Sequence, residues 1–369
     1  MTSPAPNSPR WSAVGSWLGL LLMLVFALNT AGGWVRLSGS GVAIPHWPII
    51  DLGSHRTVLP PWSDTEWQAA REAWEVHQAT LRARIERGEL NASNLGRTPK
   101  DMAGFKTLFL TEWSHRLLAA ITGIVALGVL ITVLRDGALR AAVGSVVGAA
   151  VLLIVAQAIL GGLLVDQGTN TPWLWLHQGN AGAIMGCLLW SLLVVVGLRP
   201  PPVPGRRGLL ILAAVAVLVS WSQLVTGALV AGSKGVEGGY IARDLLAIGN
   251  LWNAEQGFGY NLARNPGVAQ WLHRWSAWGL TILLAVEILI LWRARVGIRL
   301  RLVSQLLATF LGVQMLLGLA SAAIGAQPLL ILAHQATGMC LLLTSVLILF
   351  DVRSEPAEAA PQGQTVPSA

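Results

Sequence analysis

The chain has 369 residues, of which 54% are apolar and only 12% carry a charge, whereas soluble proteins carry a charge on about 25% of their residues. Its mean hydropathy of +0.59, its 40 glycines and its 17 tryptophans are typical of membrane proteins. This composition excludes a disordered chain, a fibre and an ordinary cytosolic enzyme. We interpret the net charge of +7 as a signal of membrane orientation and expect no nucleic-acid partner, because the excess is spread over short loops.

Eight apolar stretches are long enough to cross a bilayer, which takes about 20 residues of helix. They lie over 14–34, 107–134, 141–165, 172–198, 208–231, 268–292, 302–325 and 327–350. The first is not expected to be a cleavable signal peptide, because it is too long and Gly32, Gly33 and Trp34 follow it in place of a small-residue cleavage site. The sequence therefore predicts an all-α polytopic membrane protein with eight transmembrane helices.

Arginine in the short loops predicts how these helices are oriented. The loops after the second, fourth and sixth spans contain Arg135 and Arg140, then Arg199, Arg206 and Arg207, then Arg293, Arg295, Arg299 and Arg301. The positive-inside rule places these loops and both termini in the cytoplasm of a bacterial-type plasma membrane. The long connections near 35–106 and 232–267 then face outward. The tail over 353–369 is rich in Pro, Ala, Gln and Ser, which predicts a disordered cytoplasmic segment.

The first long outer connection is predicted to contain a helix of its own. Ser63 and Glu66 have the spacing of a capping box, which starts a helix. An apolar residue then recurs every seven positions among charged residues, at Trp67, Trp74 and Leu81, and Gly88 offers a stop. This pattern indicates an amphipathic helix that lies either on the outer membrane surface or on the domain itself.

The two halves of the chain repeat the same motifs at the same spacing. Glu112-Trp-Ser-His-Arg116 matches Gln270-Trp-Leu-His-Arg274, His177-Gln178 matches His334-Gln335, and Gln157 to Gly161 matches Gln314 to Gly318. Since four spans separate the copies, both copies have the same topology, and such repeats are related by an axis along the membrane normal. After a cytoplasmic N-terminus over 1–13, we predict two tandem four-helix bundles, 14–200 and 201–352, related by pseudo-two-fold symmetry.

Four of the seven histidines lie within the spans, one each in the second, fourth, sixth and eighth: His115, His177, His273 and His334. All four lie one to two turns below the predicted outer ends, where a polar residue is costly and needs a purpose. One interpretation is that each histidine makes an interhelical hydrogen bond. The interpretation we favour is two bis-histidine sites, His115 with His177 and His273 with His334, because facing helices of a bundle hold haem iron in this way.

The residues around these pairs refine the hypothesis. Zinc would need a third or fourth ligand, and only Glu112 is near in sequence. Arg116 and Arg274 follow a histidine near the outer surface, where they either pair with haem propionates or extend to the membrane interface.

The most informative difference between the halves is at Glu112, whose counterpart is Gln270. Glu112 precedes His115 by three residues, so both side chains are expected on one helix face. A carboxyl in such a site can carry protons or oppose developing positive charge. The alternative is an interfacial carboxylate that pairs with Arg116 or with solvent.

These motifs together resemble the haem A synthase family (Cox15/CtaA) over about residues 20–350. The segments that carry the resemblance are GGWVRLSGSGVAIPHWP at 32–48, GFKTLFLTEWSHR at 104–116, GALVAG at 227–232, QWLHR at 270–274 and LAHQATG at 332–338. The long outer loop is similar to that of a longer-loop subgroup. The chain departs from the family in having no outer-loop cysteines, since Cys187 and Cys340 lie within spans, and in having Ala119-Ala120 where the family has Gly-Arg.

The resemblance implies a function and a role for each site residue. The substrate would be haem O and the product haem A, formed by oxidising one ring methyl to a formyl group through successive hydroxylations and loss of water. By position, His115 and His177 would flank the substrate haem with Glu112 in the same pocket, and His273 and His334 would hold a resident haem b that passes electrons. Membrane lipid, a haem O synthase, an electron donor and a second copy of the chain are the candidate partners.

Two other functions use parts of the same pattern. A di-haem cytochrome that only transfers electrons would use the same four histidines but would not need Glu112; finding haem O or haem A beside haem b in extracted pigment would distinguish the two. A secondary transporter would fit the tandem repeat, but it predicts spans broken by Gly or Pro at mid-membrane. The predicted spans lack interior prolines.

Overall fold

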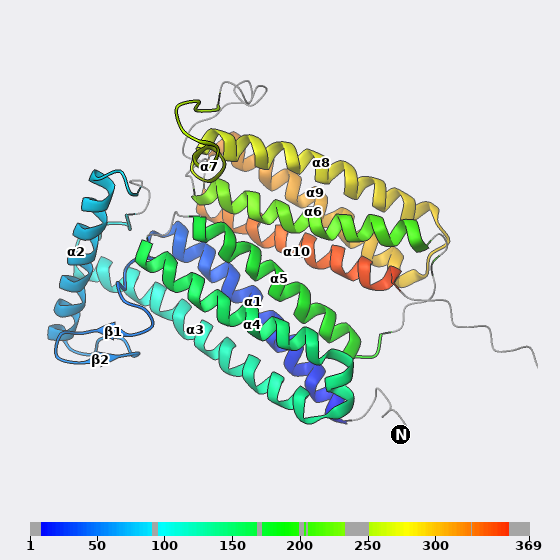
Figure 1. The fold of residues 1–369 in the computed structure, drawn as a ribbon, viewed down its shortest axis with the longest axis horizontal. Helices are drawn as coiled ribbons and strands as arrows, with labels where there is room; N and C mark the ends of the chain where they lie inside the picture. Colours follow the sequence, from blue (N-terminus) through cyan, green and yellow to red (C-terminus); the bar gives the residue numbers. More distant parts are fainter. Residues whose placement is uncertain are drawn as a thin grey trace, which may run out of the picture.

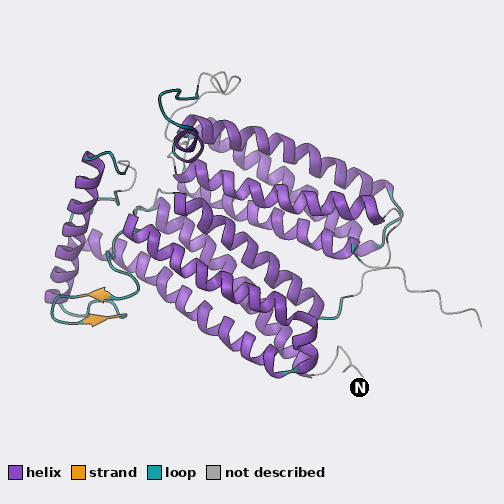
Figure 2. Cartoon of the chain, in the orientation of Figure 1, coloured by secondary structure: helices purple, strands orange, loops and turns teal. Residues whose placement is uncertain are grey.

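The computed structural model describes residues 9–90, 95–167, 172–198, 203, 206–232, 251–325 and 327–353. In chain order its elements are α1 (Pro9–Leu37), β1 (Ile50–Asp51), β2 (Arg56–Thr57), α2 (Asp64–Glu86), α3 (Met102–Arg135), α4 (Gly137–Gln167), α5 (Pro172–Val195), α6 (Arg206–Gly232), α7 (Phe258–Ala263), α8 (Pro266–Arg293), α9 (Ile298–Ile324) and α10 (Pro328–Val352). Figure 2 shows how far helix dominates, with one two-stranded antiparallel hairpin outside the bundles.

Eight of the helices within the described ranges are long and apolar enough to cross a membrane, and each covers one predicted span to within a few residues. The chain is therefore an integral, multi-pass, all-α membrane protein, as predicted. The helix α3 departs most, because it begins at Met102, where Asp101 caps the backbone N–H of Gly104 at 2.7 Å. Its 34 residues extend about 50 Å, longer than the roughly 30 Å hydrocarbon core of a bilayer.

The spanning helices form two groups of four that contact their neighbours in the same order. In the first half α1 packs on α3, α3 on α4, α4 on α5 and α5 on α1. In the second half α6 packs on α8, α8 on α9, α9 on α10 and α10 on α6. The halves meet where α5 contacts α6 and α10, and where α1 contacts α10 (Figure 1). The order of helix contacts is therefore the same in the two halves, and the pseudo-two-fold relation between them stays a prediction.

The predicted amphipathic helix is α2, and it begins where the capping box places it. The Ser63 hydroxyl accepts from the backbone N–H of Glu66 at 3.3 Å, and the Glu66 carboxylate accepts from that of Ser63 at 3.1 Å. Its apolar face is buried, and Gly88 follows its end at a φ of 73°. Of the two predicted locations the domain is the correct one, because Trp67 and Trp74 pack in a buried cluster with two phenylalanines of α3.

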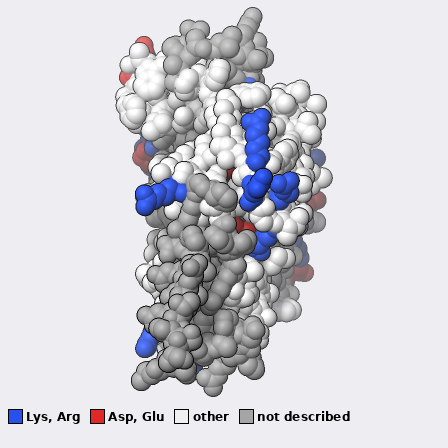
Figure 3. All heavy atoms as spheres, turned by 90° about the vertical axis from the view of Figure 1, so that its right-hand side faces the viewer, with Lys and Arg blue, Asp and Glu red and all other residues white. Residues whose placement is uncertain are grey.

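The molecule has two distinct ends. The helices α2 and α7 and the hairpin lie at one end, whereas α1 begins and α10 ends at the other (Figure 1). Figure 3 views the molecule from this second end and shows several Lys and Arg side chains among mostly uncharged atoms. Residues 1–8 of the predicted N-terminus over 1–13, residues 354–369 of the predicted tail and residues 233–250 of the second long connection lie outside the described residues.

Candidate functional site

Each of the four predicted histidines lies against a glycine of a neighbouring helix in the same half. A Cβ at that glycine would lie 3.1 to 3.6 Å from the ring. The pairs are His115 on Gly32, His177 on Gly161, His273 on Gly227 and His334 on Gly318. These glycines belong to the repeated motifs, but the sequence alone does not show that they face the rings. Their missing side chains let each imidazole sit at a helix–helix contact.

The second-half pair lies face to edge between α8 and α10. The centroids of the His273 and His334 rings are 6.3 Å apart, with an angle of 82° between the ring planes. One metal ion can bridge such a separation, since metal–imidazole bonds are about 2 Å long. The Nδ1 atom of His334 is buried without a hydrogen-bond partner among the described residues. A buried polar atom without a partner is unusual, and a metal ion would satisfy it.

Polar side chains of α6 surround the ring of His273. The amide nitrogen of Gln223 and the hydroxyl of Thr226 each lie 3.0 Å from Nδ1 of His273. The hydroxyl of Ser276 in turn donates to the Gln223 Oε1 atom at 2.6 Å. This leaves Nε2 of His273 as the nitrogen available to a ligand. These residues could not be predicted from the sequence, because Gln, Thr and Ser are common in membrane helices.

The predicted first-half pair belongs to α3 and α5. His115 of α3 lies against Gly32 of α1, and His177 of α5 lies against Gly161 of α4. The Nδ1 atom of His177 is buried and lacks a hydrogen-bond partner in the described part of the chain. The second-half histidines are therefore in ring contact, whereas each first-half histidine lies at a helix contact of its own bundle and their pairing stays a prediction.

Glu112 is buried at 3% exposure beneath the loop that follows α1. Its Oε2 atom accepts from the backbone N–H of Ile44 at 2.9 Å, and its Oε1 atom pairs with the Arg116 guanidinium. Arg116 also donates to the carbonyls of Ile44 at 2.7 Å and His46 at 2.6 Å. The carboxylate pairs with Arg116, as one of the two interpretations of Glu112 expects. It is buried, however, whereas that interpretation placed it at the membrane interface.

The two predicted propionate arginines are in different situations. The guanidinium of Arg116 is already engaged by one carboxylate and two carbonyls. Arg274 is half-buried and has no polar partner within the described ranges. Arg274 can therefore bind an anionic group, whereas Arg116 connects Glu112 to the loop that follows α1.

A polar bridge that the sequence analysis missed connects the two halves. The Asn29 amide of α1 donates to Gln178 Oε1 at 3.1 Å, and Gln335 donates to Asn29 Oδ1 at 2.9 Å. Gln178 follows His177 and Gln335 follows His334 directly. One side chain thus joins the segments that carry a histidine of each pair.

Other predicted features can now be placed. The described residues contain no group of three or more His, Cys, Asp or Glu that could hold a metal ion, so they form no zinc-type cluster. Cys187 and Cys340 are free thiols within α5 and α10.

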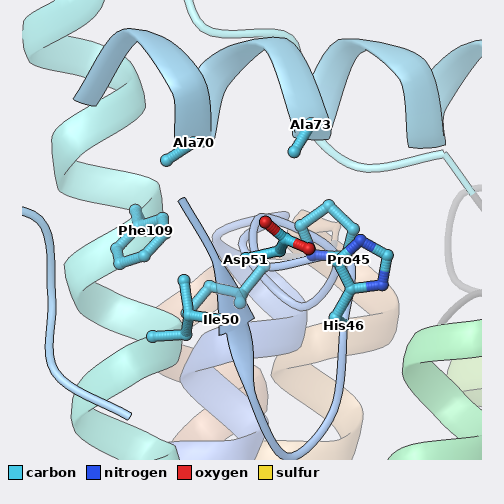
Figure 4. Close-up of a pocket in the computed structure, with 8 residues that line it drawn as sticks. Pro45, His46, Ile50, Asp51, Ala70, Ala73 and Phe109 are labelled. Carbon is cyan, nitrogen blue, oxygen red and sulfur yellow. The ribbon is translucent and has the colours of Figure 1, made fainter. Parts of the chain in front are cut away.

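A small pocket lies beneath α2, at the loop whose residue Ile44 is hydrogen-bonded to Glu112 (Figure 4). Its lining comprises Ile44, Pro45, His46, Ile50, Asp51, Ala70, Ala73 and Phe109. It has room for little more than a water molecule, so it is no site for a large ligand. Its importance is that α2 covers the loop segment to which Glu112 and Arg116 are bonded.

Comparison with known proteins agrees with these features. Residues 15–346 match the model of the cytochrome oxidase assembly protein family COX15-CtaA. The chain is 33% identical to a heme A synthase of Rhizorhabdus wittichii, over 93% of this chain and 94% of that protein. It is 31% identical to a heme A synthase of Rhodopseudomonas palustris strain BisB5, over 100% and 99% of the two chains. With its eight spans and a histidine in four of them, the chain belongs to the COX15-CtaA family.

Proposed function

We propose that this protein is a haem A synthase, an oxidoreductase that converts one ring methyl of haem O to a formyl group, a four-electron oxidation of the methyl carbon that requires an external oxidant such as dioxygen. The observation that carries the proposal is the combination of two half-buried histidines in each half with a buried carboxylate three residues before His115. Its relatives named heme A synthase support the same function.

The first half is the proposed substrate site. His115 and His177 would bind the iron of haem O and so fix the position of its ring. Glu112 is held close by, because Ile44 and Arg116 both bond its carboxylate. A carboxylate in a water-poor pocket can take up a proton from the reacting methyl carbon or stabilise positive charge that develops there. The loop over 43–47, covered by α2, would keep bulk water away from this carboxylate.

The second half is the proposed electron-transfer site. His273 and His334 would hold a resident haem b, and the unpaired Nδ1 atom of His334 and the ring separation of 6.3 Å fit this role. When bound, haem b supplies one-electron redox chemistry. Arg274, whose guanidinium has no hydrogen-bond partner among the residues that the structure describes, would bind a propionate. An external electron donor and a haem O synthase that delivers the substrate are the proposed partners.

The test of this function is the substitution Glu112→Gln, which gives the first half the residue that the second half has at Gln270. We expect the protein to fold and to keep haem b, while haem A formation falls by about 100-fold or more and haem O accumulates. The measurement is mass analysis of pigment extracted from cells that carry only the variant.

A matched control is available in Glu287→Gln. Glu287 is also a buried carboxylate within a span, at 1% exposure, but it lies fourteen residues beyond His273. This variant should form haem A normally. If Glu112→Gln also forms haem A at the wild-type level, Glu112 has no part in the chemistry, and the di-haem electron carrier becomes the better assignment.

A further inference from the structure

The two histidine sites differ in the residues that face the first histidine of each pair. Gly32 packs on His115, and Gly227 packs on His273. We therefore align α1 with α6 by placing these two glycines at equivalent positions. In this register Gln223 corresponds to Leu28, and Thr226 corresponds to Ala31. Counting three residues on from each histidine, Ser276 corresponds to Leu118. Three polar side chains in the second half thus replace three apolar ones in the first.

The three polar residues form one connected network around His273. The Gln223 amide donates to the His273 backbone carbonyl at 2.9 Å and lies 3.0 Å from Nδ1. Thr226 donates its hydroxyl proton to the Gln223 carbonyl at 3.0 Å, and its oxygen lies 3.0 Å from the same Nδ1. Since α6 packs directly on α8 (Figure 1), this network spans the helix contact.

Gln223 and Thr226 both lie at Nδ1, which leaves Nε2 as the nitrogen of His273 that can bind a metal ion. The proton of the Thr226 hydroxyl is used on a backbone carbonyl, so its lone pairs can accept Nδ1–H of the ring when Nε2 binds iron. The Gln223 amide nitrogen can only donate, and its bond to the His273 backbone carbonyl holds its side chain beside the ring. Such partners of a ligating histidine also make it a stronger ligand, and their loss weakens metal affinity by about 10–100-fold.

His115 lacks this support in the first half. Leu28, Ala31 and Leu118 have no hydrogen-bonding side chain, so none of these three positions can support the His115 ring as Gln223, Thr226 and Ser276 support His273. A site that takes up a substrate and releases a product of similar size requires a histidine that binds iron weakly enough to dissociate. A site for a resident cofactor requires a histidine that binds iron tightly.

We infer that Gln223 and Thr226 are positioning residues that make the second-half site retain its haem, and that Leu28 and Ala31 leave the first-half site able to exchange its haem. This inference rests on the proposed function, because it takes one haem to be resident and the other to be substrate. How tightly each site retains its haem then depends on the residues around the histidines rather than on the histidines themselves.

The test measures how fast haem b leaves the purified protein in the presence of excess apomyoglobin, which captures released haem. In the double variant Gln223→Leu, Thr226→Ala, which carries first-half residue types, we expect release to be about 10–100-fold faster than in the wild type. Thr226→Ser keeps the hydroxyl and should release haem b at the wild-type rate. Ser222→Ala is the matched control, because that hydroxyl is exposed and donates only to the Leu218 carbonyl of its own helix.

The outcomes separate this inference from the proposed function. If the wild type contains no bis-histidine haem b, the proposed function is wrong. If the wild type contains it but the double variant releases it at the wild-type rate, the inference is wrong and the function stands. Should the double variant fail to fold, Thr226→Val alone, which keeps the side-chain shape, decides the question by the same rate. The reciprocal variant Leu28→Gln, Ala31→Thr should slow the release of haem A, and unchanged release would contradict the inference.

Discussion

At the scale of single residues, Arg116 holds together the parts of the proposed substrate site. Its guanidinium binds the Glu112 carboxylate and the carbonyls of Ile44 and His46, which belong to a separate segment of the chain. A guanidinium can do this because its donors point in several fixed directions in one plane. A propionate-binding role for Arg116 stays a prediction, and three hydrogen bonds of its guanidinium are made to the protein itself.

The substitution Arg116→Lys should therefore impair the reaction although it preserves the charge. An ammonium group can replace one of the three contacts but not all of them, so Glu112 and the loop over 44–46 should move relative to each other. Since displacement by about 1 Å can cost about 100-fold in rate, we expect haem A formation to fall by about that factor while haem b stays bound. Pigment analysis measures both quantities in one experiment.

The control for this experiment is Arg71→Lys, at an exposed pair with Glu75 on α2. Such a pair contributes little, so this variant should form haem A like the wild type. Unchanged haem A formation in Arg116→Lys would show that the position of Glu112 does not depend on the guanidinium.

The residues that the sequence could predict are those that are costly in a membrane. Histidines and a carboxylate stand out in apolar spans, and their repetition indicated which ones form pairs. Gln223, Thr226 and Asn29 were not predicted, because an amide or a hydroxyl is tolerated in a span and acquires its role only from the helix packed against it. The same holds for the glycines under the histidine rings.

At the scale of elements, α2 and the first turns of α3 form one unit outside the bundle. Trp67 packs edge-on against Phe109 with ring centroids 5.2 Å apart, and against Phe105 at 6.4 Å. Ile44, the residue that bonds both Glu112 and Arg116, belongs to the same buried cluster. The cluster thus connects the surface helix to the proposed substrate site.

Removing the central aromatic ring should loosen this unit. For Trp67→Ala we expect a local destabilisation of about 3–5 kcal/mol, since a large buried ring is lost. Hydrogen–deuterium exchange should become faster over residues 64–86 and 43–47 but not within α8 to α10. Trp62→Ala is the control, because Trp62 is 81% exposed. Unchanged exchange in the 43–47 loop of Trp67→Ala would mean that α2 does not support it.

The sequence predicted α2 well because both its signals are local. A capping box and a seven-residue repeat need no knowledge of the rest of the chain. The early start of α3 at Met102 was missed for the opposite reason. Lys106 interrupts the apolar run, and only contact with α2 shows why Phe105 continues the same helix.

At the scale of the whole molecule, the two halves are joined by contacts between α1, α5, α6 and α10 and by the Asn29 bridge. In the α1–α6 register Asn29 corresponds to Leu224, so the bridge, like Glu112, has no copy in the other half. The repeat therefore supplies the frame, and in the proposed function the unrepeated polar residues distinguish the two halves.

The orientation of this frame in the membrane is the last prediction. The helix α3 ends at Arg135, α4 begins just before Arg140, α8 ends at Arg293 and α9 begins just before Arg299, all at the end of the bundles where α1 begins and α10 ends (Figure 1). Since arginine-rich short loops stay in the cytoplasm, we expect both termini inside and both histidine pairs nearer the outer side. A fluorescent protein fused after residue 369 should fluoresce, and alkaline phosphatase fused there should be inactive. As a control, phosphatase inserted at Gly88, beyond the end of α2, should be active. An active phosphatase at the C-terminus would reverse the assignment and place the α2 unit and the Glu112 site on the cytoplasmic side.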